Sequence, residues 1–189
     1  MNALMQAANE AAPLWHQSIM RLGWQHFMLA LLYMAAALLC LLNAHVPKQA
    51  SHGRAGWHVA AGVLCLLAVE TVLAGAQWFA AVCRALAHLH GWYGERRIVQ
   101  YVALAFLLAL IVRFAGLLHR RLAGSGMAAR DLVLGLAALM LLNAMRHVSA
   151  HHTDLVSNLR LAGISVARLV ELAALCMVVR GALVNLRLR

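Results

Sequence analysis

The sequence predicts an all-α fold, a polytopic transmembrane helical bundle of five spans preceded by a short interfacial helix. Of its 189 residues, 64% are hydrophobic and only 12% are charged, about half the roughly 25% that soluble domains carry. Several apolar runs approach the about 20 residues that cross the hydrocarbon of a bilayer. These runs are too long for strands, and helices satisfy their own backbone hydrogen bonds in lipid. We therefore expect residues 1–189 to form a single membrane domain.

The N-terminal segment is more mixed than the rest of the chain. Residues 1–22 contain no long apolar run, and Pro13 interrupts what there is. A short helix that begins after Pro13 and lies in the membrane interface fits this pattern. Trp15 and Trp24 would then lie at headgroup level, where aromatic side chains are enriched.

Five spans follow from the apolar runs. They are expected at about residues 27–46, 59–82, 98–118, 132–150 and 161–183. The helix of the second span is expected to continue to Gly91. The fourth apolar run, Leu132–Met145, has only 14 residues, so it crosses the bilayer if its helix continues through Arg146. As a re-entrant element it would reduce the count to four.

An odd number of spans puts the two termini on opposite sides of the membrane. Basic residues are slightly more numerous on the C-terminal side, so the positive-inside rule favours an outside N-terminus and a cytoplasmic C-terminus. A multi-pass protein of the cell inner (plasma) membrane is expected. The connections between spans two and three and between spans four and five then share one membrane face.

That face gathers the most polar stretches of the chain, HLHGWYGERR (88–97) and RHVSAHHTD (146–154). We call their charged and histidine side chains the rim cluster and predict that they form a ligand site. The rim cluster consists of His88, His90, Arg96, Arg97, Arg146, His147, His151, His152 and Asp154. Because helical residues four apart share a face, a continuous second helix would also align Glu70, Gln77, Arg84 and His88 into a polar track.

Two ligands suit the rim cluster. His147 and His151, one helical turn apart, are able to share a metal ion that Asp154 completes, although spacing alone is a weak signal. Arg96, Arg97 and Arg146 are instead suited to the phosphate of an anionic lipid headgroup. In that case a histidine would be available as a general acid or base for hydrolysis or transfer.

Charges inside the spans suggest other functions. Glu70 is expected near the middle of span two and Glu171 near the middle of span five, with Arg168 one turn from Glu171. Such residues are costly in lipid and mark a functional or structural network. One alternative is a non-catalytic membrane subunit or scaffold whose helices this network locks. Another is a proton- or cation-coupled transporter.

The remaining cofactor and partner predictions rest on composition. Eleven histidines raise a haem b membrane subunit as a further alternative. Axial haem ligands need facing helices at matched depth inside the membrane, whereas His26 and His45 would both lie near the interfaces, so this alternative is the least favoured. The net charge of +10 is placed at helix ends, which favours anionic lipids as partners rather than nucleic acid. Partner membrane proteins or a second copy of the chain fit a bundle of this kind.

Overall fold

The computed structural model describes residues 3–20, 23–45, 51–91, 94, 96–122, 126–147, 160–161 and 164–187. In chain order its elements are α1 (Ala3–Met20), α2 (Trp24–Ala44), α3 (Ser51–Leu73), α4 (Gly75–Leu89), α5 (Arg96–Arg121), α6 (Gly126–His147), β1 (Arg160–Leu161), β2 (Ile164–Ser165) and α8 (Val166–Arg187). The two short strands pair antiparallel immediately before α8. The protein is an all-α helical bundle, as the sequence predicts.

Five of the helices, α2, α3, α5, α6 and α8, are long and apolar enough to cross a membrane. The protein is therefore a multi-pass membrane protein, and the predicted count of five is confirmed. The fourth span reaches the required length because α6 begins at Gly126, before the apolar run, and continues past Arg146. Its 22 residues extend about 33 Å at 1.5 Å per residue, enough for the hydrocarbon.

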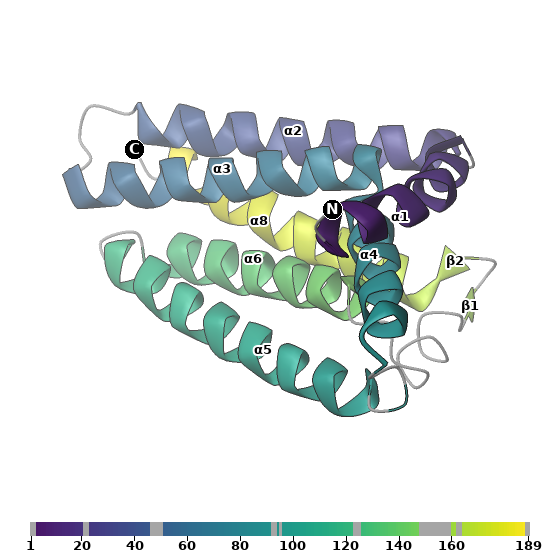
Figure 1. Cartoon of the computed structure of the whole chain (residues 1–189). Helices are drawn as coiled ribbons and strands as arrows, with labels where there is room; N and C mark the ends of the chain where they lie inside the picture. The colour runs from purple at the N-terminus through teal and green to yellow at the C-terminus, as the bar shows by residue number, and fades with distance from the viewer. Residues whose placement is uncertain are drawn as a thin grey trace.

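The bundle is built from two antiparallel helix pairs, α2 with α3 and α6 with α8, which meet where α2 contacts α8 (Figure 1). The core lies between them and includes the fully buried side chains of Trp57, Leu64, Leu136 and Val178. Helix α5 packs mainly against α6, on the outside of the bundle. This arrangement brings the start of α2, the end of α3, the end of α6 and the start of α8 to one end of the molecule.

Close contact between α6 and α8 depends on two glycines. A Cβ atom at Gly135 would lie 2.6 Å from the Ala174 carbonyl oxygen, and one at Gly181 would lie 2.6 Å from the Ala128 carbonyl oxygen. Both distances are too short for any side chain, so the two backbones approach as closely as glycine allows. Small residues at helix interfaces commonly permit such an approach in membranes.

The prediction that the second span covers residues 59–82 and continues as one helix to Gly91 is wrong. Helix α3 ends at Leu73, and Ala74 adopts a left-handed conformation with φ 51° and ψ 39°. The chain therefore changes direction, and α4 leaves the bundle. The Trp15 indole of α1 donates a 2.7 Å hydrogen bond to the Leu73 carbonyl oxygen at this break. The predicted polar track is also wrong, because Glu70 and Arg84 lie on different helices.

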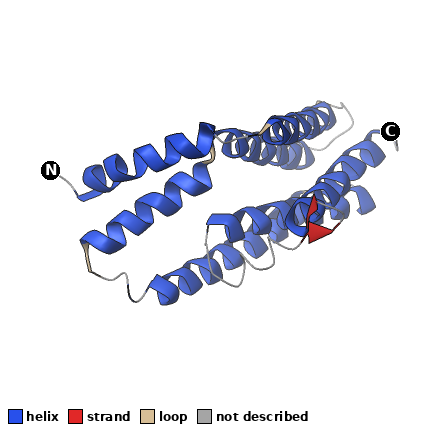
Figure 2. Cartoon of the chain, turned by 90° about the vertical axis from the view of Figure 1, so that its right-hand side faces the viewer, coloured by secondary structure: helices blue, strands red, loops and turns tan. Residues whose placement is uncertain are grey.

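The N-terminal helix is longer than the sequence suggested. It begins at Ala3, ten residues before Pro13, so the prediction of a start after Pro13 is wrong. Its alanine-rich first half has high helix propensity, and Ala7 and Ala11 pack closely against Val82 of α4. Figure 2 shows α1 and α4 extending together from one end of the bundle. This packing explains why a helix forms on both sides of the proline.

Candidate functional site

The charged residues predicted within the spans gather near one end of the bundle rather than at its middle. Glu70 lies in the last turn of α3, and Glu171 lies in the second turn of α8. The sequence placed both near mid-span because it set the end of span two too late and the start of span five too early. Arg168 in the first turn of α8 and Arg146 at the end of α6 lie at the same end.

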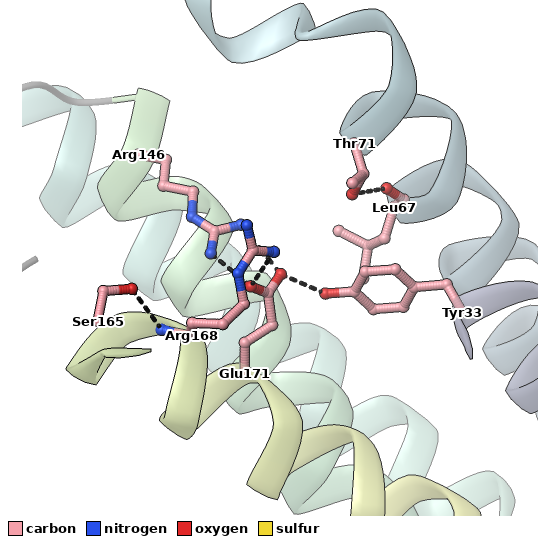
Figure 3. A network of polar contacts seen from close by, with 7 residues as sticks. All are labelled: Tyr33, Leu67, Thr71, Arg146, Ser165, Arg168 and Glu171. Carbon is pink, nitrogen blue, oxygen red and sulfur yellow. Dashed lines mark hydrogen bonds and ion pairs between the residues drawn. The ribbon is translucent and has the colours of Figure 1, made fainter. Parts of the chain in front are cut away.

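Four side chains form what we call the Glu171 cluster: Tyr33, Arg146, Arg168 and Glu171 (Figure 3). Arg146 donates two hydrogen bonds to the Glu171 carboxylate, from Nη1 to Oε1 at 3.0 Å and from Nη2 to Oε2 at 2.6 Å. Arg168 Nη1 reaches the same Oε2 at 3.4 Å. The Tyr33 hydroxyl donates to Oε1 at 2.8 Å. The carboxylate therefore joins α2, α6 and α8.

Burial within the cluster is uneven. Glu171 and Tyr33 are 1% and 2% exposed, whereas the side chains of Arg146 and Arg168 keep 35% and 24% of their accessible surface. A buried carboxylate is tolerated when it is paired and hydrogen-bonded, and Glu171 meets that condition. The acceptor is buried in the bundle, whereas the two arginine side chains that contact it are only partly buried.

Among the described residues, the two arginines keep N–H donors that the cluster does not use. A guanidinium carries five N–H donors, and the contacts with Glu171 use two from Arg146 and one from Arg168. Two buried polar atoms at the same end, Asn143 Oδ1 and His26 Nδ1, have no hydrogen-bond partner among the described residues. Buried polar atoms of this kind are normally satisfied by water or a ligand.

Glu70 belongs to the surroundings of the Glu171 cluster. Its charge interacts electrostatically with Tyr33 and Arg146. The neighbouring Thr71 donates a 2.8 Å hydrogen bond to the Leu67 carbonyl oxygen of its own helix. Of the predicted intramembrane network, the structure thus joins Arg168 and Glu171 directly, and Glu70 acts on Arg146, which pairs with Glu171. It also adds two residues that sequence reasoning did not place there.

Those two residues are Tyr33, which was missed, and Arg146, which was assigned to the rim cluster. A phenol in the middle of the apolar helix α2 was the available signal for Tyr33, because a buried tyrosine hydroxyl usually finds a hydrogen-bond partner. No comparable signal existed for Arg146. Its partner lies 25 residues away on a helix whose start was misjudged.

The rest of the rim cluster is only partly described. His88 and His90 lie exposed at the end of α4. Arg96, Arg97 and His147 belong to helices, but nothing is described of their side chains. His151, His152 and Asp154 lie outside the described residues. Within the described part of the chain, no group of three or more metal-ligating side chains is found, and the metal site at His147, His151 and Asp154 stays a prediction.

The opposite end of the bundle holds a different set of polar contacts. Asn43 donates a 3.0 Å hydrogen bond to the Ala182 carbonyl oxygen and accepts one from Asn185, which joins α2 to α8 a second time. The His45 and His58 rings pack edge to face with centroids 5.7 Å apart. His26 and His45 lie at opposite ends of α2, as the sequence indicated.

Comparison with protein-family models, with curated protein sequences and with solved structures finds no match to this chain. The structure shows a membrane-spanning helical protein with a buried carboxylate held by two arginines and a tyrosine at one end of its bundle.

Proposed function

We propose that the protein binds the anionic headgroup of a membrane lipid through Arg146 and Arg168. The observation that carries this proposal is that both guanidinium groups contact one oxygen, Glu171 Oε2, at 2.6 and 3.4 Å. Two partly exposed arginine side chains therefore meet at one buried carboxylate. Such a pair suits the planar, bidentate recognition of a phosphate.

The position of the pair supports a lipid as the ligand. Arg146 lies at the end of one span and Arg168 at the start of another, which is the level at which lipid phosphates lie. Basic residues between helix ends commonly bind anionic headgroups. The acceptor Asn143 Oδ1, one turn before Arg146, has no partner among the described residues. A headgroup hydroxyl would supply the donor that this oxygen lacks.

The experiment is native mass spectrometry of the protein in mild detergent, titrated with phosphatidylglycerol and, separately, phosphatidylcholine. We expect tighter binding of phosphatidylglycerol and at least a tenfold loss of that binding in the double variant Arg146→Gln with Arg168→Gln. Arg180→Gln is the matched control. Arg180 lies on the same helix α8, and its side chain, which pairs with Asp131, is 65% exposed. A double variant that binds phosphatidylglycerol as the native protein does would contradict the proposal.

The second candidate is a non-catalytic scaffold whose helices the Glu171 cluster locks. It is favoured by the burial of Glu171 and by the bonds that this side chain accepts from three helices. The same double variant separates the two functions. A pure lock predicts a lower unfolding temperature with unchanged lipid binding, whereas a headgroup site predicts loss of binding.

The metal interpretation of the rim cluster has its own test. Elemental analysis of protein purified without chelator would give about one Zn, Cu or Mn per chain, lost in the double variant His147→Ala with His151→Ala. Metal-free protein would contradict this interpretation. The result does not bear on Arg168, which has no part in the proposed metal set.

A further inference from the structure

Helix α5 is the least covered of the five spans. Only 11% of its most apolar stretch is buried, against 39–44% for the other four. It packs mainly on α6, and its buried residues include Ile111 and Leu118. The opposite face therefore meets either lipid or another protein.

A charged residue lies on that outer face. Arg113 is exposed, and with Ile111 facing inward it is two residues, or about 200°, away around the helix. Within the described part of the chain, Arg113 forms no hydrogen bond or ion pair. It lies eight residues before Arg121, where α5 ends, which corresponds to about 12 Å along the axis. Its Cα is thus well inside the span.

Helix geometry makes it unfavourable for the Arg113 side chain to extend to the nearer membrane interface. The nearer interface is at the C-terminal end of α5, where His119, Arg120 and Arg121 are exposed. Side chains on an α-helix lean towards its N-terminus. Arg113 is therefore directed along the helix away from that interface, and a lone arginine within lipid is unfavourable.

The outer face of α5 has the form of a helix-packing surface. Its exposed residues at heptad spacing are Val102, Phe106, Ala109, Arg113 and Gly116. Small residues on both sides of Arg113 let another backbone approach, and no atom lies within 4 Å of a Cβ built at Gly116. The heptad spacing suits a second helix running along α5.

We propose that this face of α5 docks a transmembrane helix of a partner protein that carries an Asp or Glu carboxylate at the depth of Arg113. The carboxylate would pair with the guanidinium and the partner's apolar residues would cover Val102 and Phe106. A second copy of this chain does not fit. A two-fold axis along the membrane normal would place Arg113 against Arg113, and like charges at one depth repel.

The positions of the acidic residues also indicate that the partner of Arg113 is a different protein rather than a second copy of this chain. Among the described spans, Asp131 pairs with Arg180, Glu171 belongs to the Glu171 cluster, and Glu70 interacts electrostatically with that cluster. No carboxylate of the described spans is presented on an outer face to receive Arg113 from another copy.

The probe is a synthetic leucine–alanine helix of about 20 residues with one Glu at the depth of Arg113, compared with the same peptide carrying Gln. Association is measured by energy transfer between dye-labelled protein and peptide in phosphatidylcholine vesicles. We expect the Glu peptide to associate at least tenfold more tightly than the Gln peptide. Arg113→Leu should remove that difference, and Arg180→Leu, the matched control, should keep it.

Three results would overturn the proposal. Equal association of the Glu and Gln peptides would show that no carboxylate is recognised. A preference that survives Arg113→Leu would place the recognition elsewhere. Loss of the Glu preference when phosphatidylglycerol replaces part of the phosphatidylcholine would show that Arg113 binds lipid phosphate instead of a partner helix.

Discussion

The two ends of the α6–α8 pair carry the same kind of ion pair in different surroundings. At one end Arg146 contacts Glu171 at 2.6 Å, and Glu171 is 1% exposed. At the other end Arg180 contacts Asp131 at 3.4 Å, and the Arg180 side chain is 65% exposed. An exposed pair contributes little, whereas removing one partner from a buried pair is strongly destabilising. The burial of an ion pair therefore indicates its contribution to stability better than the types of residue that form it.

The number of helices joined also differs between the two ends. The Glu171 carboxylate accepts a hydrogen bond from Tyr33 of α2 in addition to its arginines, so three helices depend on one side chain. The Asp131–Arg180 pair joins α6 and α8 alone. The variants below test this difference.

The largest effect is expected from Glu171→Ala. This change leaves two guanidinium groups and a buried phenol without their shared acceptor, and it should lower the free energy of unfolding by about 3–5 kcal/mol. Thermal unfolding in mild detergent measures the loss. An unfolding temperature equal to that of the native protein would show that the buried end does not hold the bundle together.

A smaller loss of stability is expected from a substitution at Gly135, which lies between the two ends of the α6–α8 pair. Gly135→Val inserts a side chain where a Cβ would lie 2.6 Å from the Ala174 carbonyl oxygen, and overpacking of this kind costs about 1–3 kcal/mol. The same unfolding assay applies. Gly62→Ala is the control, because no atom lies within 4 Å of a Cβ there, and it should not lower the unfolding temperature.

Tyr33→Phe tests how much the hydrogen bond from α2 contributes at the buried end. Only the 2.8 Å hydrogen bond to Glu171 is lost, and interhelical hydrogen bonds in membranes are worth ~0.6 kcal/mol on average. A double-mutant cycle with Glu171→Gln measures the coupling between the two side chains. Additive effects of the two substitutions would mean that α2 is held by packing rather than by this bond.

The smallest effect is expected at the exposed end. Arg180→Gln removes the contact with Asp131, and exposed pairs contribute about 0–1 kcal/mol. Unfolding measured at low and high salt should show a small difference that salt reduces further. A loss comparable to that of Glu171→Ala would remove the distinction between the two ends.

The sequence was sufficient for the fold class and the number of spans, because runs of apolar residues report directly on length in lipid. It was insufficient for the ends of the helices. Ala74 itself gave no sign of a left-handed residue, since alanine normally favours a continuing helix, and the neighbouring Gly75 was a local sign of a break that was not used. The start of α8 was set too early because Leu161 and Ile164, which lie in β1 and β2, are as apolar as the helix itself.

The misplaced helix ends also shift the depth of the candidate site residues. The pairing of Arg168 with Glu171 follows from their spacing, as predicted, but the pair lies near a helix end rather than at mid-span. Arg146 was assigned to the rim because polar neighbours surround it in the chain, whereas its partner lies across the bundle. Contacts between helices are set by three-dimensional packing, and the pattern of a single helix does not record them.

The hydrogen bond from Trp15 to Leu73 has a consequence for the timing of assembly. It joins residues 58 positions apart, and the surface on which α1 packs, including Val82, is made later still. At synthesis rates of about 5–20 residues per second, α1 waits about 3–12 s after Trp15 is made before its acceptor exists. During that time α1 lacks its partner, so the first helix to be synthesised docks only after α3 and part of α4 have been made.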